Sequence, residues 1–178
     1  MQITSSKCRI QDSRLMHYLS CLTERPSLEE LVQQIKGFES SLEDLSPYIH
    51  FRNKQYQRNL IFENEHVQLL CICWKSGQRS VIHDHANSAC VVKTITGIAS
   101  ETTFERNPDG FIKEIETIDY TEDVMGSEDD DIHQISNLQT SGEDLITLHC
   151  YSPPLRSMKS YSLDSKQAEA IEPIVNEG

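Results

Sequence analysis

Three histidines are the residues of this chain whose type and spacing best suit metal binding. His83 and His85 stand two residues apart in a short apolar run, so on a strand both imidazoles point to the same face. His133, in a later segment, can supply a third nitrogen. Three neutral histidines leave coordination positions open, as a catalytic metal requires. The first pair alone could equally be two ordinary histidines, so the spacing indicates a metal site without identifying the metal.

A second polar group is expected on one strand near the end of the chain. Thr147, His149 and Tyr151 alternate with apolar residues, and alternate residues of a strand share a face. His149 can then hydrogen-bond Tyr151, with Thr147 orienting the imidazole. The alternative is a polar set that lines a barrel without a chemical role. The pattern favours a site in which an imidazole and a phenol act together.

Helical patterns occupy the first part of the chain, and strand patterns occupy the rest. Ser27 and Glu30 form a capping box, the following apolar residues recur with helical spacing, and Gly37 is placed to end the helix. Weaker helical patterns cover residues 12–22 and 41–45. Short β-branched and apolar runs, separated by turn residues, predict strands at residues 67–74, 80–82, 89–95, 98–104, 111–120 and 145–151.

These patterns predict a mainly β fold. Many short strands at this spacing are typical of a sandwich or a small barrel, and we expect the helices to pack on one side of it. The chain has 178 residues, with no internal repeat and no low-complexity linker. This length and texture favour a single domain over residues 1–178, with a helical extension at 1–48 and a β-barrel at 49–178.

Composition limits the classes of partner. The formal charge of −12 disfavours nucleic acid, whose phosphates an acidic surface repels. No stretch is long and apolar enough for a membrane span, and the first residues lack the apolar run of a secretory signal. The six cysteines do not form paired CxxC motifs, so neither a structural zinc site nor a disulfide framework is expected. We therefore expect a cytoplasmic monomer that binds neither nucleic acid nor membrane.

The surroundings of the histidines resemble the two motifs of the cupin superfamily. A glycine precedes His83 by six residues, another follows His85 by twelve, and an asparagine follows His133 by four. Cupins usually carry a glutamate ligand after the first two histidines, but Cys90 stands at the position that keeps the spacing to the second glycine. An acidic run also replaces the proline and glycines that usually precede the last histidine. A cupin with three histidines and no glutamate resembles cysteine dioxygenase.

Four segments resemble that family in the family's own order. They are residues 56–60 (YQRNL), 71–74 (CICW), 82–90 (IHDHANSAC) and 148–154 (LHCYSPP). Together they cover the predicted barrel and are specific as a set. The N-terminal helices and the last twenty or so residues match much less clearly.

The resemblance implies a cupin-type jelly-roll with N-terminal helices packed on one side. It implies a thiol dioxygenase that oxidises L-cysteine with O2 to cysteine sulfinic acid. The reaction would take place at one iron(II) ion held by His83, His85 and His133. The small-molecule substrate and O2 are the partners that this function requires.

The resemblance also implies roles for further side chains. Arg58 would bind the substrate carboxylate, because a guanidinium fork suits bidentate recognition of that group, although a single arginine is more often a surface residue. Tyr56 would line the substrate pocket. Cys90 would form a thioether with Tyr151, as in the animal-type enzymes, whereas many bacterial relatives have glycine there. The residues implied for catalysis are Tyr151, His149, Cys90 and Thr147.

Three other functions remain open from the sequence. Related thiol dioxygenases act on mercaptopropionate and usually carry glutamine in place of the carboxylate-binding arginine, and Gln57 is adjacent to Arg58. A non-enzymatic metal-binding cupin module would need the histidines alone. An isomerase-type or storage cupin would not need Arg58, His149 and Tyr151 together. The arginine segment and Cys90 favour the cysteine enzyme.

Overall fold

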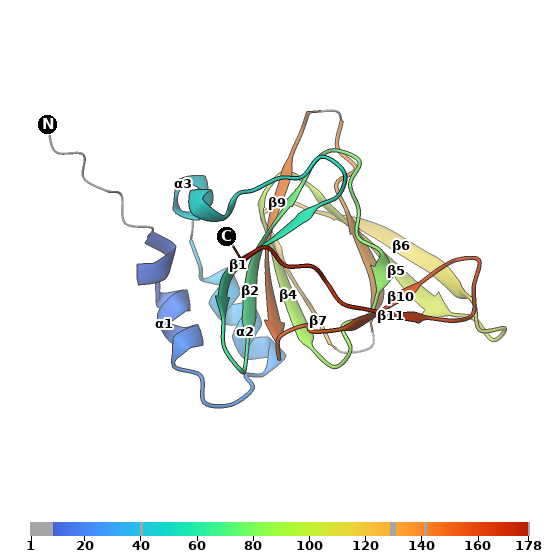
Figure 1. Cartoon of the computed structure of the whole chain (residues 1–178), viewed down its shortest axis with the longest axis horizontal. Coiled ribbons are helices and arrows are strands. Elements are labelled where there is room, and N and C mark those ends of the chain that lie inside the picture. Colours follow the sequence, from blue (N-terminus) through green and yellow to red (C-terminus); the bar gives the residue numbers. More distant parts are fainter. Residues whose placement is uncertain (1–8, 40, 129–130, 141, 178) are drawn as a thin grey trace, which may run out of the picture.

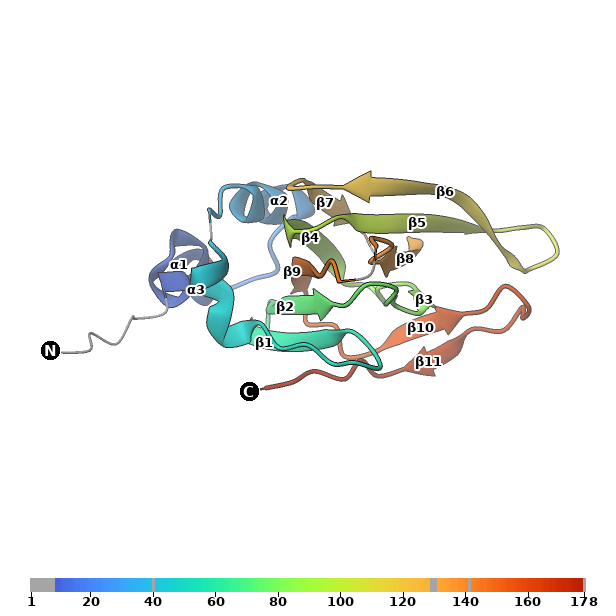
Figure 2. The same ribbon diagram turned by 90° about the horizontal axis from the view of Figure 1, so that it is seen from above.

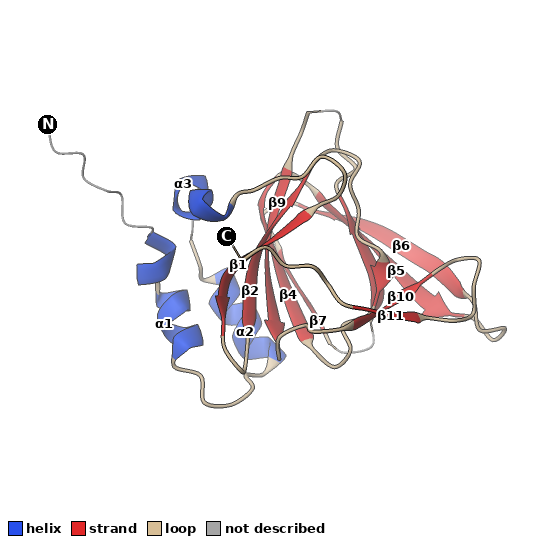
Figure 3. Cartoon of the chain, in the orientation of Figure 1, coloured by secondary structure: helices blue, strands red, loops and turns tan. Residues whose placement is uncertain are grey.

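The computed structural model describes residues 9–39, 41–128, 131–140 and 142–177. Two β-sheets face each other, and the helices cover the outer face of one sheet (Figures 1 and 3). Within the predicted acidic run, residues 129 and 130 lie outside the described residues, as does Cys8. None of the described helices combines the length and the apolar character needed to span a bilayer.

The helices occupy the first part of the chain, as predicted. Ser27 accepts from the backbone N–H of Glu30, and the Glu30 carboxylate accepts from the Ser27 N–H, which confirms the capping box. Gly37 is the C-terminal cap of that helix. The helical elements are η1 (Arg9–Asp12), α1 (Arg14–Ser20), α2 (Leu28–Lys36), α3 (Leu42–Leu45) and η2 (Ser46–Tyr48).

The strands form two sheets in which all the described strand pairs are antiparallel. The first sheet has the order β1-β2-β9-β4-β7, and the second has the order β11-β10-β3-β8-β5-β6. The strands are β1 (Gln57–Glu63), β2 (Gln68–Trp74), β3 (Ile82–His83), β4 (Ala89–Thr96), β5 (Ala99–Arg106), β6 (Ile112–Tyr120), β7 (Val124–Ser127), β8 (Ile132–Ser136), β9 (Leu145–Ser152), β10 (Met158–Tyr161) and β11 (Glu169–Ile171).

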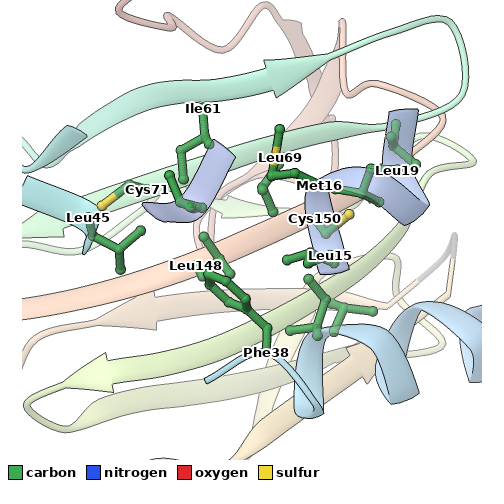
Figure 4. Packing of buried hydrophobic residues seen from close by; sticks show 14 of the residues in the cluster. Leu15, Met16, Leu19, Phe38, Leu45, Ile61, Leu69, Cys71, Leu148 and Cys150 are labelled. Carbon is green, nitrogen blue, oxygen red and sulfur yellow. The ribbon is translucent and has the colours of Figure 1, made fainter. Parts of the chain in front are cut away.

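The central strands β2 and β9 of the first sheet are buried on both faces, and β9 shows how its residues divide. Leu148 and Cys150 point to the helices and pack in a cluster that includes Leu31 of α2 (Figure 4). The residues between them point into the space between the two sheets, where Tyr151 joins a second apolar cluster. Every residue of β9 is buried, because helices cover one face and the second sheet covers the other. The shared face predicted for Thr147, His149 and Tyr151 is confirmed.

A glycine turn carries the chain from the first sheet to the second. Gly97 lies between β4 and β5 with a φ of +86°, and a Cβ at this position would lie 2.7 Å from the carbonyl oxygen of Asp144. Only glycine fits both the left-handed backbone and this close approach. The turn therefore places β5 in the second sheet and β4 in the first.

The predicted fold class is confirmed, with additional strands. The described strands form two facing sheets of a jelly-roll rather than one continuously hydrogen-bonded barrel. The sequence patterns did not reveal β1, β7, β8, β10 and β11. The last four are strands of three to five partly polar residues, which show no clear period. The helices share a core with the first sheet, and we propose that both parts form one domain.

Candidate active site

Three buried histidines meet between the sheets. His83 on β3 lies directly opposite His133 on β8 in the antiparallel ladder, and His85 follows β3 by two residues. One ligand atom from each histidine can be chosen so that all three lie within 4.8 Å of one another. The ring centroids are 4.7–5.5 Å apart. Pairing of β3 with β8 therefore brings together histidines that are far apart in the sequence.

Each imidazole uses Nδ1 for an outer partner and leaves Nε2 for the centre. His83 Nδ1 lies 2.8 Å from the carbonyl oxygen of Val81, which can only accept, so this nitrogen carries the proton. His85 Nδ1 lies 3.4 Å from Ser127 Oγ. His85 Nε2 and His133 Nε2 are buried and have no hydrogen-bond partner among the described residues. Two orphaned acceptor nitrogens beside a third imidazole fit a metal ion.

Burial keeps two of these imidazoles, His83 and His85, in the neutral form that binds metals. Loss of solvation, with a smaller contribution from the neighbouring His133, lowers the pKa of His83 to about 3. Burial and the same neighbour also hold the pKa of His85 well below its ordinary value. Both rings are therefore uncharged at neutral pH, each with a single N–H. Together the three histidine nitrogens form a metal-binding site suited to a divalent transition metal.

Glu101 is a site residue that the sequence analysis missed. It lies on β5, and its Oε1 is 2.6 Å from His133 Nδ1, with the Glu101 side chain only 15% exposed. A carboxylate on the outer nitrogen of a ligating histidine fixes the ring and makes Nε2 a stronger donor. Cupins usually have a carboxylate that binds the metal directly. Here the carboxylate of Glu101 instead contacts the outer nitrogen of a histidine ligand. The spacing could have revealed it: Glu101 lies two residues after the buried Ala99 on the same strand, so both side chains point to the inner face.

Replacing Glu101 with glutamine is expected to weaken metal binding by about 10–100-fold. The amide keeps the size of the side chain but removes the negative charge beside His133. Competition between the protein and a chelator for cobalt(II) measures this affinity. The matched control is Glu105→Gln on the exposed end of the same strand. Equal affinities for both variants and the wild type would contradict a role for Glu101 in metal binding.

A chain of hydrogen bonds runs along the inner face of the first sheet. Trp74 Nε1 donates to Thr147 Oγ1 at 2.9 Å, and Thr147 Oγ1 lies 2.9 Å from His149 Nε2. His149 Nδ1 lies 3.2 Å from the Tyr151 hydroxyl. Burial, followed by the charge of Arg58, holds the pKa of His149 well below its usual value, so the ring is neutral. The sequence analysis gave Trp74 no role in this chain.

Arg58 is a buried cation that has no carboxylate partner among the described residues. It is 5% exposed, and its Nε and Nη2 atoms have no hydrogen-bond partner there. Its guanidinium carbon lies 5.2 Å from the centroid of the Tyr151 ring. A buried, unpaired guanidinium is costly and favours binding of an anion. The arrangement can therefore bind a small carboxylate beside the three histidines.

Arg58, Tyr56 and His149 line a small internal cavity. Its volume is about 10 Å³, and Tyr56 forms one wall by stacking on Trp74 with ring centroids 4.3 Å apart. This volume holds about one water molecule, so side chains must shift when a larger solute binds. A separate, larger groove of about 800 Å³ is lined in part by Cys90, Glu101 and His133.

Cys90 faces Tyr151 across the paired strands β4 and β9. The two residues are direct partners in the antiparallel register, and directly opposed residues have Cβ atoms about 4.5–5.5 Å apart. Burial raises the pKa of the Cys90 thiol and of the Tyr151 phenol, so both are protonated in this setting. The two side chains that the resemblance joins in a thioether are thus neighbours.

The comparisons with known proteins agree with this site. The family model for cysteine dioxygenase type I matches residues 5–164. Human cysteine dioxygenase type 1 is 29% identical over 158 residues, covering 83% of this chain and 76% of that protein, and the bovine enzyme is 30% identical over the same coverage. A Klebsiella pneumoniae protein with a double-stranded β-helix domain is similar in structure, with a TM-score of 0.49 and 15% identity over 71% of this chain and 97% of that one. The chain belongs to the cysteine dioxygenase type I family and is a dioxygenase enzyme.

Proposed function

We propose that this enzyme oxidises the thiol of L-cysteine with O2 to cysteine sulfinic acid, using iron(II). Both atoms of O2 add to the sulfur, and no other product is needed for the balance. The observation that carries the proposal is the unpaired guanidinium of Arg58, buried next to three metal-binding histidines. Arg58 lines the same internal cavity as His83 and His133, so it would supply a carboxylate anchor beside the metal site.

His83, His85 and His133 would hold the iron. Bound iron(II) would supply electrons for O2 and a positive charge that favours the thiolate form of the substrate. Glu101 would fix the His133 ring through its outer nitrogen. Arg58 would orient the substrate through its carboxylate, so that the thiol points toward the histidines. Tyr56 would form one wall of this pocket.

The hydrogen-bond chain would set the direction of the Tyr151 proton. Trp74 is a donor only, so Thr147 accepts from it and has its own hydrogen available for His149 Nε2. With Nε2 accepting, Nδ1 carries the ring proton and donates to the Tyr151 oxygen. The phenol hydrogen is then available to donate into the pocket. Tyr151 would act as a hydrogen-bond donor to substrate or oxygen, and Thr147 as a positioning residue.

We also propose that Cys90 and Tyr151 form a thioether in the active enzyme. A bond from Cys90 Sγ to the Tyr151 ring carbon next to the one that carries the hydroxyl removes two hydrogen atoms. O2 is the oxidant that takes up the two electrons and two protons. We expect the protein purified after turnover to be lighter by two hydrogen atoms, and Cys90→Ser to keep the mass calculated from its sequence. Intact-mass spectrometry checks this. An unchanged wild-type mass after many turnovers with cysteine would refute the crosslink.

The register of β1 favours cysteine over mercaptopropionate as the substrate. Gln57 pairs with Cys73, which packs under the helices, whereas Arg58 pairs with Ile72, which faces the space between the sheets. Neighbouring residues on a strand point to opposite faces, so Arg58, not Gln57, is directed toward the histidines. The guanidinium is therefore the group that a substrate would meet.

Oxygen consumption by the iron-loaded protein tests the proposed function. We expect uptake with L-cysteine to exceed uptake with mercaptopropionate, and one sulfinic acid to form for each O2 consumed. Mass spectrometry of the product checks the second point. A clear preference for mercaptopropionate would show that this thiol, not cysteine, is the substrate. No oxygen uptake with any small thiol would refute thiol oxidation.

The monomeric state and the cytoplasmic location are also proposals. The charge of −12 gives a self-repelling surface that supports a monomer without nucleic-acid partners. Sedimentation of the holoenzyme at several concentrations tests the first point.

A further inference from the structure

The last described residues form a strap between the two sheets. The chain leaves β11, at the edge of the second sheet, and runs to β1, at the edge of the first sheet (Figures 1 and 2). We define the strap as residues 172–177. It ends against the strand that carries Arg58, and it lies beyond residues 5–164, which the family model matches. Its course therefore connects a segment outside the family match to the proposed substrate anchor.

Asn176 forms an isolated parallel β-bridge with Asn59 at the edge of β1. Its backbone N–H donates to the Arg58 carbonyl at 2.8 Å, and its carbonyl accepts from the Leu60 N–H at 2.9 Å. Its side-chain amide donates to the Asn59 side chain at 3.2 Å. In an antiparallel pair, alternate residues direct both backbone groups away from their partner strand, so Arg58 and Leu60 meet the strap instead of β2.

Apolar contacts hold the strap in place. Val175 is partly buried and packs with the cluster between the sheets, as do Tyr56 and Leu60. The neighbouring Ile174 points outward and is 72% exposed. The strap is thus docked through one face. Val175 belongs to the same apolar cluster as Tyr56, which lines the Arg58 pocket.

The β1 backbone matters because the Arg58 side chain has few contacts of its own, chiefly a hydrogen bond to the Tyr151 side chain. Two of its guanidinium nitrogens lack a hydrogen-bond partner among the described residues, and Tyr151 supports it from the side. In the substrate-free chain its position depends on the backbone from which it extends. We propose that the strap, through Asn176 and Val175, is a positioning element that sets Arg58 for the substrate carboxylate. This inference rests on the proposed role of Arg58.

The test compares two thiols that differ only in the carboxylate, L-cysteine and cysteamine. Asn176→Pro removes the N–H that the Arg58 carbonyl accepts, and Val175→Ala weakens the docking without touching the backbone. We expect each variant to raise KM for L-cysteine, by about tenfold for Asn176→Pro, with kcat and all cysteamine kinetics within about twofold of wild type. Ile174→Ala is the matched control and should equal wild type. Hydrogen exchange of the Leu60 amide should quicken in Asn176→Pro.

The outcomes separate this inference from the proposed function. Equal losses for both thiols would show a general structural role and overturn the inference. Unchanged kinetics in Asn176→Pro and Val175→Ala would also overturn it. Arg58→Ala is measured in parallel. If Arg58→Ala lowers the preference for cysteine over cysteamine while the strap variants keep it, only the inference fails, and if Arg58→Ala keeps it, the carboxylate anchor fails as well.

Discussion

Replacing His85 with alanine is expected to abolish iron binding and with it all oxygen consumption. His85 is fully buried, and its Nε2 has no hydrogen-bond partner among the described residues. Loss of a direct ligand should cost more than the roughly 10–100-fold that loss of an outer partner costs. Iron content after dialysis, and cobalt(II) titration followed by absorbance, measure the effect. Chelation followed by iron(II) should restore the wild type but not the variant.

His17→Ala is the matched control for this experiment. His17 is exposed on α1 and lies outside the metal group, so iron content and activity should equal those of the wild type. A thermal melt of metal-free protein separates a lost ligand from a lost fold. If His85→Ala binds iron with wild-type affinity and remains folded, the proposed ligand set is wrong.

Replacing Arg58 with alanine is expected to lower kcat/KM for L-cysteine by about 100- to 1,000-fold. Removing one partner of a buried charge pair costs roughly 2–5 kcal/mol, because the other charge is left unpaired. Here the unpaired charge would be the substrate carboxylate. Cysteamine has no carboxylate, so its kcat/KM should change little. Steady-state oxygen uptake with both thiols measures the difference, and equal losses for the two thiols would contradict a carboxylate anchor.

The same position should show a stability effect of opposite sign. The Arg58 guanidinium is buried without a carboxylate in the substrate-free chain, which costs folding free energy. Arg58→Met keeps much of the side-chain volume and removes the charge, so we expect a higher free energy of unfolding, by about 1–3 kcal/mol. Urea denaturation of the metal-free protein checks this. A lower stability would show that the contacts of the guanidinium with Tyr151 stabilise the fold by more than burial of the charge costs.

The fold class and part of the site could be predicted because they depend on local period. His83 and His85 are two residues apart in the extended segment that begins with β3, so they had to point to the same side. Thr147, His149 and Tyr151 had to share a face of β9 for the same reason. The capping box fixed the start of α2. The resemblance of four ordered segments pointed to the family that the comparisons then established.

Contacts between strands could not be predicted in this way. A period shows which face a residue occupies but not which residue lies across from it. The pairing of β8 with β3 and β5 puts Glu101 against His133, and the pairing of β2 with β9 puts Trp74 against Thr147. Both contacts span strands that are far apart in the sequence.

The sequence by itself determined the three histidines, the residues that share their faces, and a mainly β chain with helices at one end. The tertiary structure decided which histidine nitrogens stay free, which carboxylate supports the site, and that Asn176 meets Arg58. The physical reason is that side-chain direction follows from backbone period within one strand. Partners across strands depend on the register and burial that only the folded chain sets.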